Sequence, residues 1–328
     1  MGGGLDVRWG LAPFLTAALL LSGAARAEEE EHEQASKLPR IYGRVLANAT
    51  ADERTVYERQ FNVTDARIGA SAQPFDWLQT VLEVDASSHA PIKDAYGRFR
   101  DPSHRYRLYA GQFKAPFTAR YEESNWELPL VDRGVADDFL AKAGFTGHRL
   151  GLMVERKAKG KHDALSFRAA LLQGTDDDAG IHTGEDVAGR VEYRLFKPLT
   201  VGVGAYWGGL SSGAHRHSLT FDSTLRVRAL RITGEVTHGQ AWPGAFTTGT
   251  ALATYDIPLT DDGEWVLQPV AAAEAIRVPS GVQGYSTRAG ANLLVGDSFK
   301  VMLQGEDALR PQEAWSGKAL VLGLGARF

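Results

Sequence analysis

From Arg40 to the end of the chain, apolar and polar residues alternate in short segments. In one clear case, Leu219 and Phe221 alternate with Thr220 and Asp222. A period of two places one face of a β-strand in an apolar environment and the other in a polar one. The pattern predicts sixteen strands, near residues 40–48, 65–70, 78–86, 92–99, 106–114, 149–155, 165–171, 190–195, 199–207, 218–226, 230–236, 246–257, 264–276, 284–295, 298–306 and 317–328.

The connections between these segments alternate in length. Lys197-Pro198 and Gly296-Asp297 read as two-residue turns, whereas the connections at 174–186, 209–215, 238–246 and 307–316 read as longer. Short periplasmic turns, longer extracellular loops and an even strand number are typical of bacterial outer-membrane barrels. Residues 40–328 are therefore expected to form an all-β fold, a 16-stranded antiparallel transmembrane β-barrel.

The last strand supports the same fold. In Lys318–Phe328, one face carries Leu320, Leu322, Leu324, Ala326 and Phe328. Because it ends in an aromatic residue on its apolar face, this strand resembles the terminal strand of bacterial outer-membrane barrels. The alternative is an amphipathic edge strand of a soluble sandwich.

Residues 115–146 interrupt the alternation for about thirty residues. A loop of this length inside a compact domain is uncommon and usually functional. Because it carries Phe117, Tyr121 and Trp126 among other apolar groups, we expect it to fold into the barrel lumen and constrict it. Within it, Val135–Ala143 predicts a short helix that packs Phe139 and Leu140 on the wall and turns Asp137, Asp138 and Lys142 toward water.

The first 27 residues are typical of a signal peptide. An uncharged run from Trp9 to Ala25 follows Arg8, and small residues at Ala25 and Ala27 predict cleavage after Ala27. The alternative, a membrane anchor, is marginal because the run is short for about 30 Å of hydrocarbon. Residues 28–39 read as an acidic, solvated periplasmic tail. Export to the cell outer membrane is the expected localisation.

The composition limits the chemistry that the chain can perform. It has no cysteine and a formal net charge of −4, which argue against a disulfide framework and a nucleic-acid partner. Zinc-ligand spacing and a phosphate-binding P-loop are both missing from the sequence, so we expect no metal and no cofactor. Asp176, Asp177 and Asp178 are expected to form a solvated loop tip rather than a cation site.

One motif favours a different class of function. Gly209–Gly213 matches the G-x-S-x-G nucleophile elbow, and His215 and His217 follow Ser211 closely, as in a barrel lipase or esterase. That motif needs a helix after it, but Ser218–Arg226 predicts a strand. We therefore expect a glycine-rich loop and no enzyme, with the barrel enzyme and a non-conducting structural barrel kept as alternatives.

Strand parity turns many charges toward the lumen. The expected basic lining consists of Arg44, Arg67, Arg149, Arg168, Arg190, Arg194, Arg226, Arg231 and Arg288, opposed by ten acids. Selectivity then depends on where charges cluster, because arginine rings favour anions and carboxylate rings favour cations. The alternative is that these charges pair across strands and stiffen a water-filled wall.

Residues 111–117, GQFKAPF, resemble the phosphate-selective porin O and P family, as do Ser124, the run Leu130–Arg133 and Gly147-x-Arg149-x-Gly151-Leu152. The resemblance implies an outer-membrane porin, a trimer that passes small anionic solutes such as phosphate. It also implies an anion path at the constriction, where Lys114 and Arg133 match motif positions and Arg120 lies between them. One departure concerns the charge of the loop, which holds four bases against six acids from Lys114 to Thr146.

Overall fold

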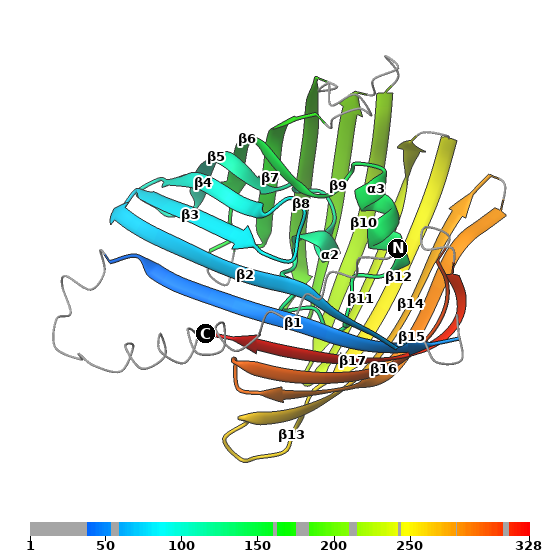
Figure 1. The fold of residues 1–328 in the computed structure, drawn as a ribbon. Helices are drawn as coiled ribbons and strands as arrows, with labels where there is room; N and C mark the ends of the chain where they lie inside the picture. Colours follow the sequence, from blue (N-terminus) through cyan, green and yellow to red (C-terminus); the bar gives the residue numbers. More distant parts are fainter. Residues whose placement is uncertain are drawn as a thin grey trace, which may run out of the picture.

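The structure is a computed structural model that describes residues 38–53, 59–159, 163–174, 184–209, 215–241, 244–279, 281–310 and 315–328. Within these ranges the chain forms strands and two short helices (Figure 1). Their bounds are β1 Arg40–Asp52, β2 Arg59–Phe75, β3 Leu78–Asp85, β4 Ile92–Arg100, β5 Tyr106–Lys114, α2 Ala119–Glu122, α3 Val135–Lys142, β6 His148–Arg156, β7 Leu165–Gln173, β8 Glu185–Phe196, β9 Leu199–Gly209, β10 His215–Val227, β11 Leu230–Ala241, β12 Gly244–Tyr255, β13 Ile257–Pro258, β14 Trp265–Val278, β15 Gly281–Val295, β16 Phe299–Arg310 and β17 Trp315–Arg327.

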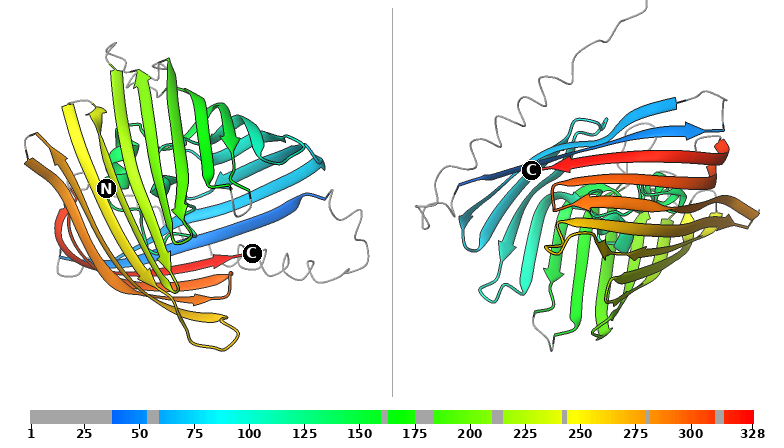
Figure 2. Two further views of the ribbon diagram at one scale, coloured as in Figure 1. Left: turned by 180° about the vertical axis from the view of Figure 1, so that it is seen from behind. Right: turned by 90° about the horizontal axis from the view of Figure 1, so that it is seen from below.

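The strands form one closed antiparallel sheet (Figures 1 and 2). Each strand pairs with the next in sequence, and β1 closes the ring by pairing with β17 from Arg44↔Arg327 to Asp52↔Ala319. The two-residue β13 continues β12 past Asp256 along the same partner, β14, so the seventeen labelled segments of the described chain make sixteen strands. The predicted sixteen-stranded antiparallel barrel is confirmed.

The two faces of the barrel wall have opposite character, as the alternation predicts. On β16, Leu303 is 50% exposed on the outer face, while the next residue, Gln304, is 2% exposed on the inner face. Large apolar side chains are exposed on the outside of most strands, and charged ones are buried inside. Because buried polar groups need partners, the interior must be a network of hydrogen bonds and ion pairs.

Two connections are shorter than the sequence predicts. Strand β11 runs on to Ala241 and β12 starts at Gly244, so the expected loop at 238–246 is mostly strand. His238 and Thr247 lie opposite each other there, 2.9 Å apart at Nδ1 and Oγ1. Likewise β16 reaches Arg310 and β17 begins at Trp315, so residues 307–310 and 315–316 of the expected loop are strand. Polar residues do not end these strands because they form cross-strand pairs.

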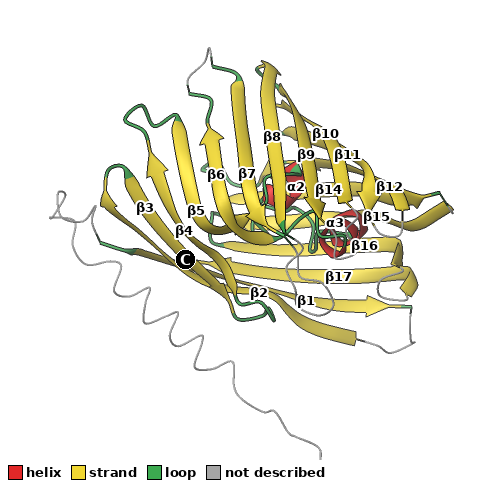
Figure 3. Ribbon diagram, turned by 90° about the horizontal axis from the view of Figure 1, so that it is seen from above, coloured by secondary structure: helices red, strands yellow, loops and turns green. Residues whose placement is uncertain are grey.

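The segment 115–146 lies within the ring of strands, where α2 and α3 are seen from above (Figure 3). An aromatic cluster packs it on the inner face of β9 and β12. Phe117 and Phe145 lie 5.7 and 5.3 Å from the Tyr206 ring, and Phe145 lies 5.4 Å from Phe246. Gly204 permits the close approach, since a Cβ there would lie 2.2 Å from the Phe117 carbonyl oxygen. None of the helices in the described ranges is long and apolar enough to cross a membrane.

Some expectations fall on residues that the structure does not describe. The signal peptide at 1–27, most of the tail at 28–39, Asp176–Asp178 and Ser211 all lie outside the described residues.

Candidate functional site

Two wall carboxylates receive the backbone of the 115–146 segment. Glu235 on β11 accepts a hydrogen bond from the Ala119 N–H at 2.8 Å, at the start of α2. Glu274 on β14 accepts one from the Ala136 N–H at 3.2 Å, in the first turn of α3. The first N–H groups of a helix have no partner within it, and the N-cap of α3, Gly134, makes no side-chain capping bond. The wall supplies that cap.

The buried side chain of Arg120, a residue of the segment, lies between a carboxylate of the segment and one of the wall. Its guanidinium pairs with Asp137 at 3.2 Å and with Glu274 at 2.9 Å. The expectation that Asp137 faces water is wrong, because this buried guanidinium needs a counter-ion. As predicted, Leu140 is buried and Phe139 packs on Phe246 at 5.0 Å, but Asp138 lies 3.7 Å from Arg310 and is not free toward water.

Two lysines each donate to three backbone carbonyls of the segment. Lys114, at the end of β5, donates to the carbonyl oxygens of residues 121, 122 and 123 at 3.0, 3.4 and 2.7 Å. Lys300, on β16, donates to those of residues 125, 126 and 128 at 3.5, 2.9 and 3.3 Å. Each ammonium has three donors, so both lysines are used fully by the backbone.

Asp132 joins the segment to two wall arginines. Its carboxylate lies 2.7 Å from Arg288 and 3.2 Å from Arg310. Burial disfavours the charged carboxylate, but the two guanidinium groups outweigh burial and lower the pKa of Asp132 to about 2. The carboxylate is therefore ionised near neutral pH, where it stays paired with both arginines.

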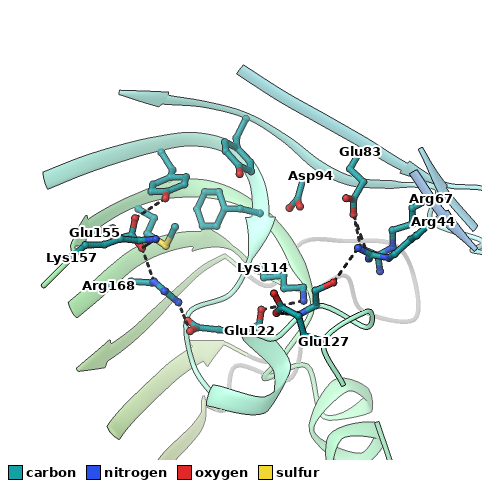
Figure 4. A pocket seen from close by; sticks show the side chains of 15 residues that line it. Arg44, Arg67, Glu83, Asp94, Lys114, Glu122, Glu127, Glu155, Lys157 and Arg168 are labelled. Atoms are coloured by element: carbon teal, nitrogen blue, oxygen red, sulfur yellow. Dashed lines mark hydrogen bonds and ion pairs between the residues drawn. The ribbon is translucent and has the colours of Figure 1, made fainter. Parts of the chain in front are cut away.

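The opposite side of the segment, toward β1–β7, is hollow. A cavity of about 310 Å³ lies between the segment and the wall, lined by Arg44, Arg67, Glu83, Asp94 and Lys114 among others (Figure 4). A cavity of about 600 Å³ adjoins it near the β3–β4 connection and shares Arg67 and Lys114 with it. A third, of about 480 Å³, adjoins it near Phe328 and shares Arg44 and Arg67. The three cavities thus follow one another along the inner wall and all meet at Arg67.

Ion pairs line this path. Arg67 lies 2.6 Å from Glu83 and 3.0 Å from Asp65, and Arg44 lies 3.3 Å from Asp65. Figure 4 shows a second set of linked ion pairs. Arg168 pairs with Glu155 of the wall, at 3.0 Å, and with Glu122 of the segment. Cross-strand pairing of opposite charges, the alternative left open by the sequence, thus accounts for much of the lining.

The structure brings only part of the predicted anion path together. Arg44, Arg67, Lys114 and Arg168 line the central cavity, and Arg133 lines the cavity toward β3–β4, 4.8 Å above the Tyr121 ring. Arg190 shares a smaller cavity with Arg168. Arg226 lies apart, beside Arg228 and Asp256. Arg120 and Arg149 line none of these cavities; Arg149 donates to the Gly144 carbonyl at 3.3 Å.

Several lining residues were not singled out from the sequence. Asp94, Tyr96 and Lys157 line the central cavity, and Lys93 lines the cavity toward β3–β4. The parity of the segment 92–99, read as for the other strands, would have turned Asp94 and Tyr96 inward. Opposite Glu83 and Val84 the register shifts, so that Asp94 pairs with Glu83 while Lys93 is the extra, unpaired residue of the strand. Such an irregularity cannot be predicted from the alternation.

The histidines near the nucleophile-elbow motif lie on the outer face. His215 and His217 are exposed and lie 5.2 and 5.4 Å from the ring of Trp207. In the described part of the chain, no group of three or more histidine, aspartate or glutamate side chains is placed to hold a metal ion.

No family model and no curated protein sequence matches the chain. Solved structures do. OmpF of Salmonella typhi, in complex with daunomycin, is 11% identical over 89% of this chain and 98% of its own, with a TM-score of 0.67. OprB of Pseudomonas putida is 11% identical over 94% and 97%, with a TM-score of 0.65. The anion-selective porin of Comamonas acidovorans is 11% identical over 89% and 100%, with a TM-score of 0.58. At this identity the similarity establishes a shared fold, that of the porin barrel.

Proposed function

We propose that this protein is an outer-membrane porin, a passive water-filled diffusion channel for small solutes that prefers anions such as phosphate. The observation that carries the proposal is the series of three cavities that meet at Arg67, between the wall of β1–β7 and the 115–146 segment. A closed barrel satisfies its backbone internally and its apolar outer face suits hydrocarbon, which supports a transmembrane location.

The 115–146 segment is the proposed constriction. It is fixed to one side of the wall through Glu235, Glu274 and Lys300, so solute passes on the other side, beside Lys114 and Arg67. Lys114 and Arg133 donate hydrogen bonds to backbone carbonyls of the segment. They therefore attract a passing anion through their positive charge and not through direct hydrogen bonds.

Planar-bilayer recording tests the proposal directly. Purified protein is expected to give discrete conductance steps, and a salt gradient is expected to give a reversal potential of the sign for anion preference. Deletion of residues 120–140 is expected to raise the conductance. A protein that inserts and does not conduct, or one that prefers cations, contradicts the proposal.

Selectivity at the constriction is tested by Lys114→Ala and Arg133→Ala together. The double variant is expected to lose part of the anion preference, because two positive charges leave the narrowest region. A reversal potential equal to that of the unmodified protein would show that these two residues do not set the anion preference.

We also propose assembly as a trimer, export by cleavage after Ala27 and the absence of enzymatic activity. The resemblance in the 111–133 region supports the first, and one structure of the same fold, OmpT of Vibrio cholerae, is described as a trimer form. Cross-linking in detergent and N-terminal sequencing of the mature protein test the first two. A serine-reactive probe, with Ser211→Ala as its control, tests the third: labelling that depends on Ser211 favours the barrel enzyme.

A further inference from the structure

A row of charged side chains crosses five neighbouring strands on the inner wall. Arg100 on β4 lies opposite Arg107 on β5, which lies opposite Glu155 on β6. Glu155 lies opposite Arg168 on β7, which lies opposite Arg190 on β8. The row thus holds two arginine–arginine pairs. Like charges directly opposite each other are destabilising, so each pair needs a counter-ion.

The second pair has its counter-ion from the 115–146 segment. The Glu122 carboxylate forms an ion pair with Arg168 and lies 3.9 Å from Arg190. Arg190 also pairs with Asp222 at 2.6 Å. The repulsion between these two arginines is therefore offset by carboxylates of the protein itself.

The first pair has no such bridge. Arg100 and its neighbour Arg98 both donate to the same neutral acceptor, the side-chain oxygen of Gln79, and Arg100 also donates to Gln73 at 3.3 Å. Among the described residues, no carboxylate lies within ion-pair distance of Arg98 or Arg100, and Arg107 has only Glu155, at 3.2 Å. The Nε atoms of Arg98, Arg100 and Arg107 are buried and have no acceptor.

The nearby acids are already occupied. Glu155 lies 3.2 Å from Arg107, 3.0 Å from Arg168 and 3.8 Å from Lys157, and it also accepts from the Tyr109 hydroxyl at 2.7 Å. In the adjoining β4–β5 turn, the Asp101 carboxylate accepts from the backbone N–H groups of residues 103 and 106. Positive charge is therefore left uncompensated around Arg98 and Arg100.

We propose that Arg98, Arg100 and Arg107 form an oxyanion-binding subsite at the β4–β5 end of the channel. The bound anion bridges Arg100 and Arg107 as Glu122 bridges Arg168 and Arg190. The planar guanidinium fork binds two oxygens at once, so the ligand is a small oxyanion with at least two acceptor oxygens, inorganic phosphate or a short carboxylate. The inference rests on the proposed channel function. It places direct anion contact away from the constriction, where the lysine donors are used by the backbone.

Binding can be measured without conductance. The protein in detergent micelles is titrated with inorganic phosphate and, separately, with succinate at constant ionic strength, and its thermal unfolding is followed. A saturable rise of the unfolding temperature is expected with at least one anion, and the two titrations tell phosphate from carboxylate. In the Arg98→Gln, Arg100→Gln double variant the affinity is expected to fall by about 10- to 100-fold, the range for losing charged hydrogen bonds. Lys197→Gln, an exposed turn residue with the same loss of charge per site, serves as the control.

A second variant separates binding from a purely structural role. Arg100→Glu places a carboxylate beside Arg98 and opposite Arg107, so it is expected to fold at least as stably and to lose the anion response. An unchanged affinity in either variant, or an unfolding temperature in unmodified protein that responds to neither anion, overturns the subsite. Lack of conductance in bilayers, by contrast, rejects the channel function and leaves the binding result standing.

Discussion

Glu274 is the wall residue whose loss is expected to release the 115–146 segment, the proposed constriction. Its side chain is 1% exposed, pairs with the 6% exposed side chain of Arg120 at 2.9 Å, and accepts from the first turn of α3. Removing one partner of a buried ion pair costs about 3–5 kcal/mol. In Glu274→Ala, Arg120 keeps Asp137 as a counter-ion, so the lower end of that range applies. About 3 kcal/mol shifts the balance between docked and undocked segment by roughly a hundredfold.

Single-channel recording measures how often the segment is undocked. Glu274→Ala is expected to add brief openings of larger conductance, because an undocked segment leaves the lumen wider. Glu274→Gln keeps an acceptor for the Ala136 N–H and is expected to give fewer of them. Glu192→Ala is the matched control, since Glu192 pairs with Arg190 on the wall at 3.1 Å and, within the described residues, forms no hydrogen bond or ion pair with the segment. A folded Glu274→Ala protein with the same conductance histogram as Glu192→Ala would refute the docking argument.

Three further outcomes are expected. Lys300→Met removes three carbonyl bonds and the contact with Trp126, so protease cleavage within the segment is expected to accelerate; equal cleavage rates contradict this. Asp132 has a folded pKa lowered from 3.8 to about 2, so its contribution is complete above pH 4 and is lost as the pH falls toward 2. Unit conductance is therefore expected to hold down to pH 4 and to rise below it, and Asp132→Asn should abolish that rise. Gly111→Ala combines a φ of 130° with a Cβ 2.2 Å from the Ala95 oxygen, whereas Gly147→Ala has a φ of 135° and open space. Each substitution is expected to lower the free energy of unfolding by about 1–3 kcal/mol through backbone strain. Unfolding by urea should show a larger decrease for Gly111→Ala, because its Cβ also clashes with the Ala95 oxygen.

The strands could be predicted because their signal is local. Whether Leu303 or Gln304 faces outward depends only on parity along β16, and each strand carries its own version of that information. Strand ends were harder, since a polar residue such as His238 ends a strand or pairs across it according to what the neighbouring strand offers.

The partners of charged residues could not be predicted in the same way. Parity turns Arg44 and Arg67 inward correctly, but register decides that they share Asp65. Arg120 was expected to line the anion path, yet its guanidinium is buried in an ion pair with Glu274, which lies far along the chain. A motif can likewise mark Lys114 without revealing that its ammonium holds carbonyls of the following turn.

The two lysines also have a mechanical consequence. Lys114 and Lys300 stand on separated parts of the wall, β5 and β16, and grip one continuous stretch of backbone between residues 121 and 128. That stretch of backbone therefore connects two separated parts of the wall across the interior of the barrel. We expect a ring braced in this way to resist flattening, so that the width of the proposed solute path depends little on the thickness or lateral tension of a surrounding bilayer.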